Sequence, residues 1–290
     1  MSAVLGVDKQ KDLTVEYPGG EFEFDKRTHL MGILNVTPDS FSDGGRYHSV
    51  DAAVEHGLRM ADEGADVIDV GGESTRPGAL PVPGEEELRR VIPVIEGLAA
   101  RLTIPISIDT YKSSVARRAI ASGARMINDV SALRFDPEMA GVAADCRVPV
   151  VLMHMRGQPA TMQKDVVYDS LIDEILDFLK ERIKEAQRAG IHPRRIMVDP
   201  GIGFGKTVID GNLMIIKHLS LFRSLGRPIL VGPSRKAFIG QILGDGASRD
   251  EGTAVLGAAA ILNGANMLRV HDVKRMKTAA TLIDAMKGVR

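Results

Sequence analysis

The sequence has few of the residues that build cross-links, metal centres or membrane spans. Among its 290 residues there is a single cysteine, Cys146, and no tryptophan. One cysteine excludes an internal disulfide and a zinc site built from cysteines, and it fits a reducing compartment. No apolar run approaches the roughly 18 residues that span a bilayer, and the start of the chain holds no apolar signal core. We therefore expect a cytoplasmic protein with no membrane partner.

An excess of charge of one sign is also missing. The 37 basic and 38 acidic side chains give a formal net charge of −1. A protein that holds nucleic acid mainly through its phosphates needs a basic face, so no nucleic-acid partner is expected.

Common catalytic motifs are absent as well. The segment GIGFGKT resembles a P-loop, but Pro200 stands where that motif needs its first glycine. The three glycines that follow, at 201, 203 and 205, do not have the spacing of a dinucleotide-binding fingerprint. The chain contains no H-E-x-x-H, no clustered His and Cys, and no G-x-S-x-G. An ATPase, a transition-metal enzyme and a nucleophilic-serine hydrolase are each disfavoured.

The sequence does contain a regular alternation of short apolar runs and amphipathic segments. Strands are predicted at 29–34, 66–70, 105–108, 126–128, 149–153, 196–198, 228–231 and 266–270. Helices are predicted near 49–63, 85–101, 112–122, 137–145, 170–189, 209–225, 251–263 and 273–287. Eight repeats in about 260 residues predict an α/β protein folded as a single (β/α)8 TIM barrel. A doubly wound open sheet is the main alternative, but the even spacing favours closure.

The residues before the first repeat predict a separate small element. Two alternating runs around Pro18-Gly19-Gly20 predict a β-hairpin over residues 12–25. We expect residues 1–27 to form a hairpin extension packed on one end of the barrel. Residues 28–290 then form the barrel, because no linker or low-complexity segment interrupts them.

Every predicted strand runs into polar side chains, and in such a barrel the chemistry lies on the loops after the strands. In chain order these side chains are Asn35, Glu73 to Arg76, Asp109, Asn128 and Asp129, His154, Asp199, Ser234 to Lys236, and Arg269 with His271. Each group has a structural alternative: the acids and the amide could cap helices, His154 could be a hydrogen-bonded rim residue, and Arg235 with Lys236 could be a solvated pair. Because all eight strand ends carry such groups, one shared polar site is the better interpretation.

The side chains in this set indicate the kind of ligand. Asp109, Asp199 and Asn128 offer acceptors and donors that suit a flat, nitrogen-rich heterocycle. Positive charge and donors suited to a phosphate or diphosphate come from Lys236, Arg269, His271 and Arg76, together with Asn35. The sequence therefore predicts a site for a planar heterocycle with a phosphorylated arm.

Longer segments around these residues resemble the dihydropteroate synthase family. They are GILNVTPDSFSDGG, DVGGESTRPGA, SIDTYK, INDVSA, LMHMRGQPATMQ, DPGIGFGK, GPSRKAFIG and RVHDV, in that family's order from about Thr28 to the end of the chain. The resemblance implies a TIM-barrel transferase of folate biosynthesis. Such an enzyme condenses (7,8-dihydropterin-6-yl)methyl diphosphate with 4-aminobenzoate and releases diphosphate and 7,8-dihydropteroate. It further implies Mg2+ as cofactor, sulfonamides as inhibitors and a homodimer.

The resemblance also implies roles for individual residues. The pterin pocket is expected at Asp109, Asn128, Met153, Asp199 and Lys236. The diphosphate site is expected at Asn35, Thr75, Arg76, Arg269 and His271, with Asn35 as the Mg2+ ligand. The 4-aminobenzoate site is expected at Thr75, Pro77, Phe204 and Ser234. Catalytic roles fall on Asp109, Asp199, Lys236, Arg269 and His271.

Two other functions are compatible with such a barrel. A pterin-binding methyltransferase would share the acid and amide pocket, but it does not need NVTPDSF, S-R-K and R-V-H in these forms. A catalytically inactive pterin binder is disfavoured because Asn35, Lys236, Arg269 and His271 are all present.

The long loops at 36–47 and 71–84 are expected to act as lids. The small-residue helix at 251–263 is expected either at a dimer interface or packed on the barrel.

Overall fold

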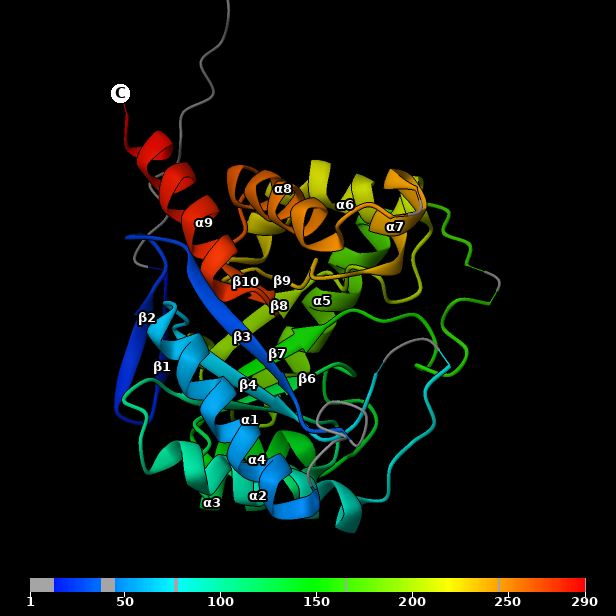
Figure 1. Ribbon diagram of the computed structural model, residues 1–290. Helices are drawn as coiled ribbons and strands as arrows, with labels where there is room; N and C mark the ends of the chain where they lie inside the picture. Colours follow the sequence, from blue (N-terminus) through cyan, green and yellow to red (C-terminus); the bar gives the residue numbers. More distant parts are fainter. Residues whose placement is uncertain (1–12, 38–44, 76–77, 165, 245, 290) are drawn as a thin grey trace, which may run out of the picture.

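Eight parallel strands form a closed ring at the centre of the molecule, and helices surround them (Figure 1). The computed structural model describes residues 13–37, 45–75, 78–164, 166–244 and 246–289. The strand order is β8-β7-β6-β5-β4-β3-β10-β9. A parallel bridge between Val198 and Ile229 links β8 to β9, and Val198 N donates to Pro228 O at 3.0 Å. The (β/α)8 barrel is confirmed, and the open-sheet alternative is wrong.

All eight predicted barrel strands are present. They are β3 His29–Asn35, β4 Val67–Gly71, β5 Ile106–Asp109, β6 Met126–Asp129, β7 Val150–Met153, β8 Ile196–Asp199, β9 Leu230–Val231 and β10 Met267–Val270. Short runs rich in Val and Ile form these strands because both faces are covered, one by the outer helices and one by the barrel interior. Every residue of β4, β7 and β8 is buried.

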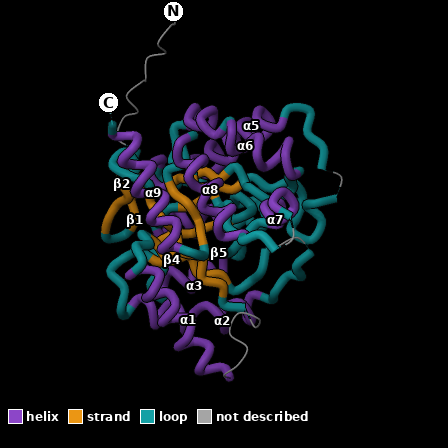
Figure 2. The backbone as a smooth tube through the Cα atoms, turned by 45° about the horizontal axis from the view of Figure 1, so that its top comes forward, coloured by secondary structure: helices purple, strands orange, loops and turns teal. Residues whose placement is uncertain are grey.

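Helices cover the outside of the ring, as the tube view shows (Figure 2). They are α1 Gly45–Asp62, α2 Gly84–Ala99, α3 Ser113–Ala121, α4 Met139–Cys146, α5 Leu171–Arg188, α6 Met214–Lys217, α7 Ala237–Leu243, α8 Arg249–Leu262 and α9 Val273–Gly288, with the 3-10 turns η2 Pro193–Arg195 and η4 Leu219–Leu225. Side chains cap two of them: Ser248 Oγ accepts from Glu251 N at the start of α8, and Asp272 Oδ1 accepts from Arg275 N at the start of α9. None of the helices in the described ranges is both long and apolar enough to cross a membrane.

The region after β8 departs from the prediction. The continuous helix expected at 209–225 is wrong: the chain forms a π-helical turn, η3 Val208–Leu213, and then α6 and η4. Asn212 provides a reason, because its Oδ1 accepts from Gly203 N at 2.7 Å and its Nδ2 donates to Thr207 O at 2.8 Å. The turn widens to tie the preceding loop to the helix, and such π-turns occur often at functional sites. The short helix α7 was not predicted.

The predicted hairpin is present as β1 Thr14–Tyr17 and β2 Gly20–Glu23. It lies at the end of the barrel where the strands begin, at the left of Figure 1. Its side chains Val15 and Phe22, with Phe24 just beyond, pack on residues that fill the lower barrel interior: Met31, Val67, Met126, Val151, Met197, Leu230 and Met267. The site must therefore lie at the opposite end, where the strands finish.

Candidate active site

A cluster of polar side chains lies inside the barrel at the carboxyl end of the strands. Asp69, Asp109, Asn128, Asp199 and Arg269 come from five different strands. The two central acids and the amide are almost fully buried, with 0% of Asp69, 7% of Asp109 and 5% of Asn128 exposed. Parallel pairing aligns these positions, since Gly71 lies opposite Asp109 and Asp109 lies opposite Asn128.

Arg269 links the two central acids of this cluster through hydrogen bonds. Its Nε donates to Asp69 Oδ2 at 2.6 Å, and its Nη2 donates to Asp109 Oδ2 at 2.7 Å. Asn128 Nδ2 donates to the same Asp69 oxygen at 3.0 Å. The guanidinium predicted to bind diphosphate is therefore tied directly to an acid predicted to bind the heterocycle.

Asp69 was not predicted, because it lies within β4 rather than at its end. A signal for it exists: it is a carboxylate inside an otherwise apolar strand, VIDVG. A fully buried acid is rare unless it has a partner or a function.

Two acid oxygens in this cluster lack partners. Asp109 Oδ1 and Asp69 Oδ1 are buried and accept no hydrogen bond from any described residue. Burial raises the pKa of Asp109 to about 7, although the Arg269 charge works against that rise. A buried acceptor without a donor is costly, and such groups commonly receive N–H donors from a ligand.

Asp199 forms a second acidic position on the neighbouring side of the ring. Its Oδ1 accepts from Gly201 N at 2.7 Å, and only 5% of the residue is exposed. Burial raises the pKa of Asp199 to about 6, while Gly201 N–H, Lys236 and other nearby cations lower it. Asp199 thus has its carboxylate buried among donors and cations at the edge of the polar cluster.

Lys236 and Phe204 lie together beside Asp199. Lys236 is the N-cap residue of α7, and its Nζ is 4.3 Å from the centroid of the Phe204 ring. Met153 ends β7 and is 4% exposed, in a small cluster with Met155 and Phe204 at its edge. An aromatic ring, a thioether and a cation thus border the acid.

His271 and Ser234 are in contact. Ser234 Oγ is 2.8 Å from His271 Nδ1, and His271 N donates to the same hydroxyl at 3.1 Å. The family resemblance implies different subsites for these two residues, so the contact indicates a shared boundary between the predicted diphosphate and 4-aminobenzoate sites.

Asn35 is the last residue of β3, Thr75 follows β4, and both are half-buried. Asn35 pairs with Gly71 through the backbone. In the described part of the chain its side-chain amide has no hydrogen-bond partner, which leaves its oxygen available. The other two predicted residues of this loop, Arg76 and Pro77, lie outside the described residues, as do parts of both expected lids.

The donor set near Asn35 fits Mg2+ better than a transition metal. Within the described ranges, no group of three or more His, Cys, Asp or Glu side chains could hold a metal ion. Mg2+ commonly takes one or two protein oxygens and completes its shell with water and phosphate oxygens. The single amide oxygen of Asn35, beside the predicted diphosphate site, would satisfy that requirement.

The structural alternatives hold for some strand-end residues and fail for others. Asp129 is a local structural residue, since its two oxygens accept from Ser131 N at 2.7 Å and Leu133 N at 2.8 Å. Arg235 forms a surface pair with Asp250. In contrast, Asp109 does not cap the following helix, because Asp136 Oδ2 accepts from Ser113 N there.

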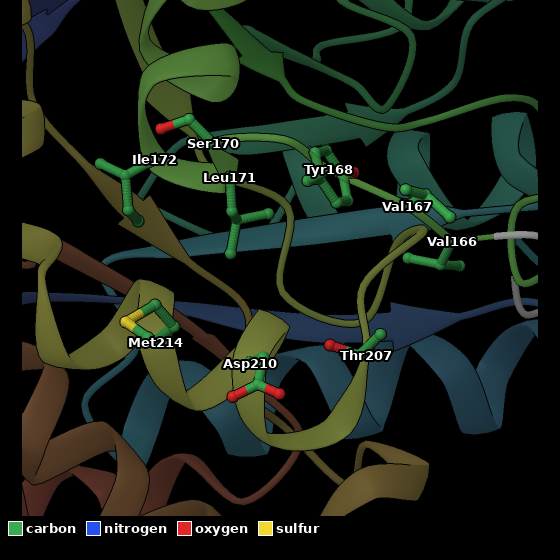
Figure 3. A pocket seen from close by; sticks show the side chains of 9 residues that line it. All are labelled: Val166, Val167, Tyr168, Ser170, Leu171, Ile172, Thr207, Asp210 and Met214. Atoms are coloured by element: carbon green, nitrogen blue, oxygen red, sulfur yellow. The ribbon is translucent and has the colours of Figure 1, made fainter.

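A cavity of about 510 Å3 lies elsewhere, between the segment before α5 and the turn η3 (Figure 3). Val166, Val167, Tyr168 and Leu171 line it on one side, and Asp210 and Met214 line it on the other. No predicted substrate-binding residue lines this cavity, so it is separate from the polar cluster.

The chain matches the family model described as pterin binding enzyme over residues 31–271. It is 47% identical over 267 residues to a dihydropteroate synthase of Synechocystis sp., a match that covers 91% of this chain and 92% of that protein. It is 48% identical over 264 residues to a dihydropteroate synthase of Bacillus subtilis, covering 91% of this chain and 90% of that one.

Solved structures agree with these matches. A Xanthomonas albilineans dihydropteroate synthase with 4-aminobenzoic acid superposes with a TM-score of 0.89 at 49% identity, covering 97% of this chain and 100% of that chain. The same species' enzyme in complex with 7,8-dihydropteroate gives 0.86 at 47% identity, covering 96% and 100%. A Yersinia pestis dihydropteroate synthase with a sulfonamide drug gives 0.88 at 41% identity, covering 96% and 100%.

Proposed function

This chain belongs to the pterin-binding enzyme family, and we propose that it is a dihydropteroate synthase. It would condense (7,8-dihydropterin-6-yl)methyl diphosphate with 4-aminobenzoate, giving 7,8-dihydropteroate and diphosphate for folate biosynthesis. The observation that carries the proposal is the buried polar cluster of Asp69, Asp109, Asn128 and Arg269 with its two unpartnered acid oxygens.

The pterin ring is proposed to bind on that cluster. Its amino and ring N–H groups would donate to Asp109 and Asp199, while Asn128 and Lys236 would donate to or accept from its remaining polar atoms. The buried thioether of Met153 would pack on the ring. The free oxygen of Asp109 and the elevated pKa values of both acids support this arrangement, because each acid gains a donor when the ring binds.

The diphosphate is proposed to bind at the rim above the ring. Arg269 and His271 would contact it, and Asn35, Thr75 and Arg76 are the other expected contacts. Mg2+, when bound through Asn35, would neutralise negative charge on the diphosphate oxygens. The Ser234 hydroxyl fixes the orientation of the His271 ring, because it bonds both Nδ1 and the backbone N–H of that residue.

We propose that the diphosphate leaves early in the reaction. An arylamine is a weak nucleophile, so the C–O bond would break before much new bonding forms. Positive charge then develops on the pterin and negative charge on the diphosphate. Asp109 and Asp199 would stabilise the cation, and Arg269 and His271 the departing anion. The short bond between Arg269 and Asp109 couples the two ends of this charge separation.

4-Aminobenzoate is proposed to enter last, beside Phe204 and Ser234, with Thr75 and Pro77 as its other expected contacts. Phe204 offers a ring face next to the Lys236 cation. A sulfonamide with the same para-amino aryl shape would compete for this place, as the Yersinia pestis complex illustrates for that enzyme.

The decisive experiment measures diphosphate release by the purified protein with pterin diphosphate, with and without 4-aminobenzoate. We expect release that depends on 4-aminobenzoate and forms an equal amount of dihydropteroate. A protein that binds pterin without releasing diphosphate would be an inactive binder or a methyltransferase, and the proposal would be rejected.

We also propose that the chain forms a homodimer in the cytoplasm through α8 and α9. Large apolar side chains are exposed along these helices, including Val255 at 69%, Leu262 at 52% and Leu282 at 62%. The two helices lie side by side at the top of Figure 1. Exposed large apolar side chains on two adjacent helices are typical of a protein interface. Val255→Asp should convert a dimer into a monomer in sedimentation analysis, whereas Val167→Asp, at an exposed site elsewhere, should not.

A further inference from the structure

A buried lysine, Lys206, lies behind the loop that follows β8, and no role described above uses it. Only 3% of Lys206 is exposed. Its Nζ donates to Phe204 O at 2.8 Å and to Gly201 O at 3.3 Å, and it lies 2.9 Å from His154 Nδ1. Three acceptors match the three N–H bonds of an ammonium group. None of these direct partners is a carboxylate, so the buried amine has no contacting counter-ion in the part of the chain that the structure describes.

His154 acts as a neutral acceptor in this arrangement. Because Nδ1 faces the ammonium, the ring proton belongs on Nε2. Burial lowers the pKa of His154 to about 2, and the charge of Lys206 adds to that effect. The histidine therefore holds the lysine in place without adding a second charge.

The loop before Lys206 is tightly wound and lies close against the end of β7. Gly201 has φ = 76°, and a Cβ there would lie 1.9 Å from the carbonyl oxygen of His154. Phe204 N donates to Gly201 O at 3.1 Å, which closes the turn. On the outer side, Gln163 Nε2 donates to Gly203 O at 2.9 Å. Lys206 provides the corresponding donors on the inner side.

The two carbonyls that Lys206 holds belong to residues that meet the proposed pterin site. Gly201 donates its N–H to Asp199 Oδ1, and the Phe204 ring lies under Lys236. Lys206 also acts at longer range, since its charge is among those that lower the pKa of Asp199. In return, burial lowers the pKa of Lys206 to about 7, and the Asp199 charge opposes this.

We infer that Lys206 is a positioning residue for the pterin site, which orders the Gly201–Phe204 loop and helps keep the Asp199 carboxylate ionised. This inference rests on the proposed function. The charged and titratable groups that act on Lys206, His154 or Asp199 include His154, Arg156, Arg134, Tyr168, Asp199, Lys236 and Arg269. Asp199 is the group in this set whose charge state the lysine would control.

The experiment measures the affinity for 6-hydroxymethyl-7,8-dihydropterin, which lacks the diphosphate, by calorimetry across pH. The variants are Lys206→Met and, as a matched control, Lys217→Met. Lys217 is an exposed lysine on the same connection between β8 and β9. Any titration of the ligand itself affects all three proteins equally.

In the parent protein, affinity should rise as Asp199 ionises and fall at higher pH as Lys206 loses its proton. In Lys206→Met the fall at high pH should vanish, and the rise should move to higher pH because Asp199 has lost a supporting charge. A shift of one pH unit corresponds to about a tenfold loss of affinity on the acidic side. Lys217→Met should retain the parent profile.

Other results would overturn the inference. If the pH profile of pterin affinity in Lys206→Met keeps the parent's shape, with affinity lowered equally at every pH or unchanged, then Lys206 does not influence the ionisation of Asp199. If Lys206→Met does not fold, the pH profile of the parent protein alone tests the inference. A pterin affinity that stays constant from neutral pH to about pH 9 would contradict a lysine that loses its proton in this range. Failure of the parent protein to bind the pterin at any pH would instead reject the proposed function.

Discussion

The two ends of the barrel differ in chemistry although the same strands build both. At the end where the strands begin, the interior is apolar: Met126, Met197 and Met267 meet Val15 and Phe22 of the hairpin. Two residues further along the same strands the interior is polar, with Asn128, Asp199 and Arg269. Side chains two apart in a strand point to the same face, so both layers face inward.

This difference shows how the fold separates stability from function. The lower layer can be packed fully because the hairpin covers it and no ligand has to enter. The upper layer keeps two buried acids, Asp69 and Asp109, each with one oxygen that has no hydrogen-bond partner among the described residues, a costly arrangement that a ligand donor would relieve. Substitutions at the start of a strand should therefore lower stability and spare turnover, whereas substitutions at its end should lower turnover.

The largest effect is expected from Arg269→Met, which leaves Asp69 and Asp109 buried without their cation. Removing one partner of a buried ion pair costs about 3–5 kcal/mol of unfolding free energy. Turnover should be lost as well, because the proposed diphosphate contact disappears. Met267→Leu, two residues earlier on the same face, is the control and should cost less than about 1.5 kcal/mol without slowing the reaction. Similar denaturation midpoints for the two variants would refute the contrast.

Asp199→Asn should separate stability from turnover further. Turnover should fall about a hundredfold or more, because a charge aimed at the developing cation is lost. Stability at neutral pH should rise instead. The pKa of Asp199 is raised to about 6, so the folded state binds a proton more tightly than the unfolded chain. Ionising the acid then lowers stability as pH rises from about 4 to 6, by up to about 3 kcal/mol.

The measurement is thermal unfolding of Asp199→Asn and the parent protein at acidic and neutral pH. The gain in stability should be present at neutral pH, should be small near pH 4, and should vanish below about pH 3, where the parent acid is protonated in both the folded and the unfolded state. An equal gain at both pH values would show that the effect is not electrostatic.

Phe22→Ala tests the apolar end. The ring is 3% exposed and packs edge-on against His29, with 5.4 Å between ring centroids. Its loss should cost about 2–4 kcal/mol through lost burial and the cavity left behind. The kcat and KM measured below the unfolding temperature should stay unchanged, since no proposed ligand reaches this layer. A reduced kcat would mean that the two ends are coupled.

The sequence was sufficient for the ring and for most of the polar set, because both follow local rules. Each strand is a short apolar run, and Asp109, Asn128, Asp199 and Arg269 stand at or next to the ends of such runs. The structure brings these residues together, as predicted, while their roles toward pterin and diphosphate stay predictions.

What the sequence did not reveal depends on contacts between distant segments. Asp69 pairs with Arg269 across 200 positions, and Lys206 meets His154 across 52. No local sequence pattern predicts either of these contacts. The continuous helix at 209–225 failed for a similar reason, since the Asn212 side chain serves Gly203 rather than the helix. Propensity does not include such a tertiary hydrogen bond.

The smallest effect is expected at the boundary between the layers, at Ser107. Ser107 lies on β5 two residues before Asp109 and faces the barrel interior. Its buried hydroxyl has no hydrogen-bond partner among the described residues. Ser107→Ala removes an unsatisfied group, so the unfolding free energy should stay level or rise by about 1 kcal/mol. Ser107→Val is the matched, larger apolar variant and tests the space available. Unchanged pterin affinity in Ser107→Ala would place the start of the functional layer at Asp109. A tenfold loss would mean that the ligand site reaches one layer deeper, and the boundary drawn between the two ends would have to move.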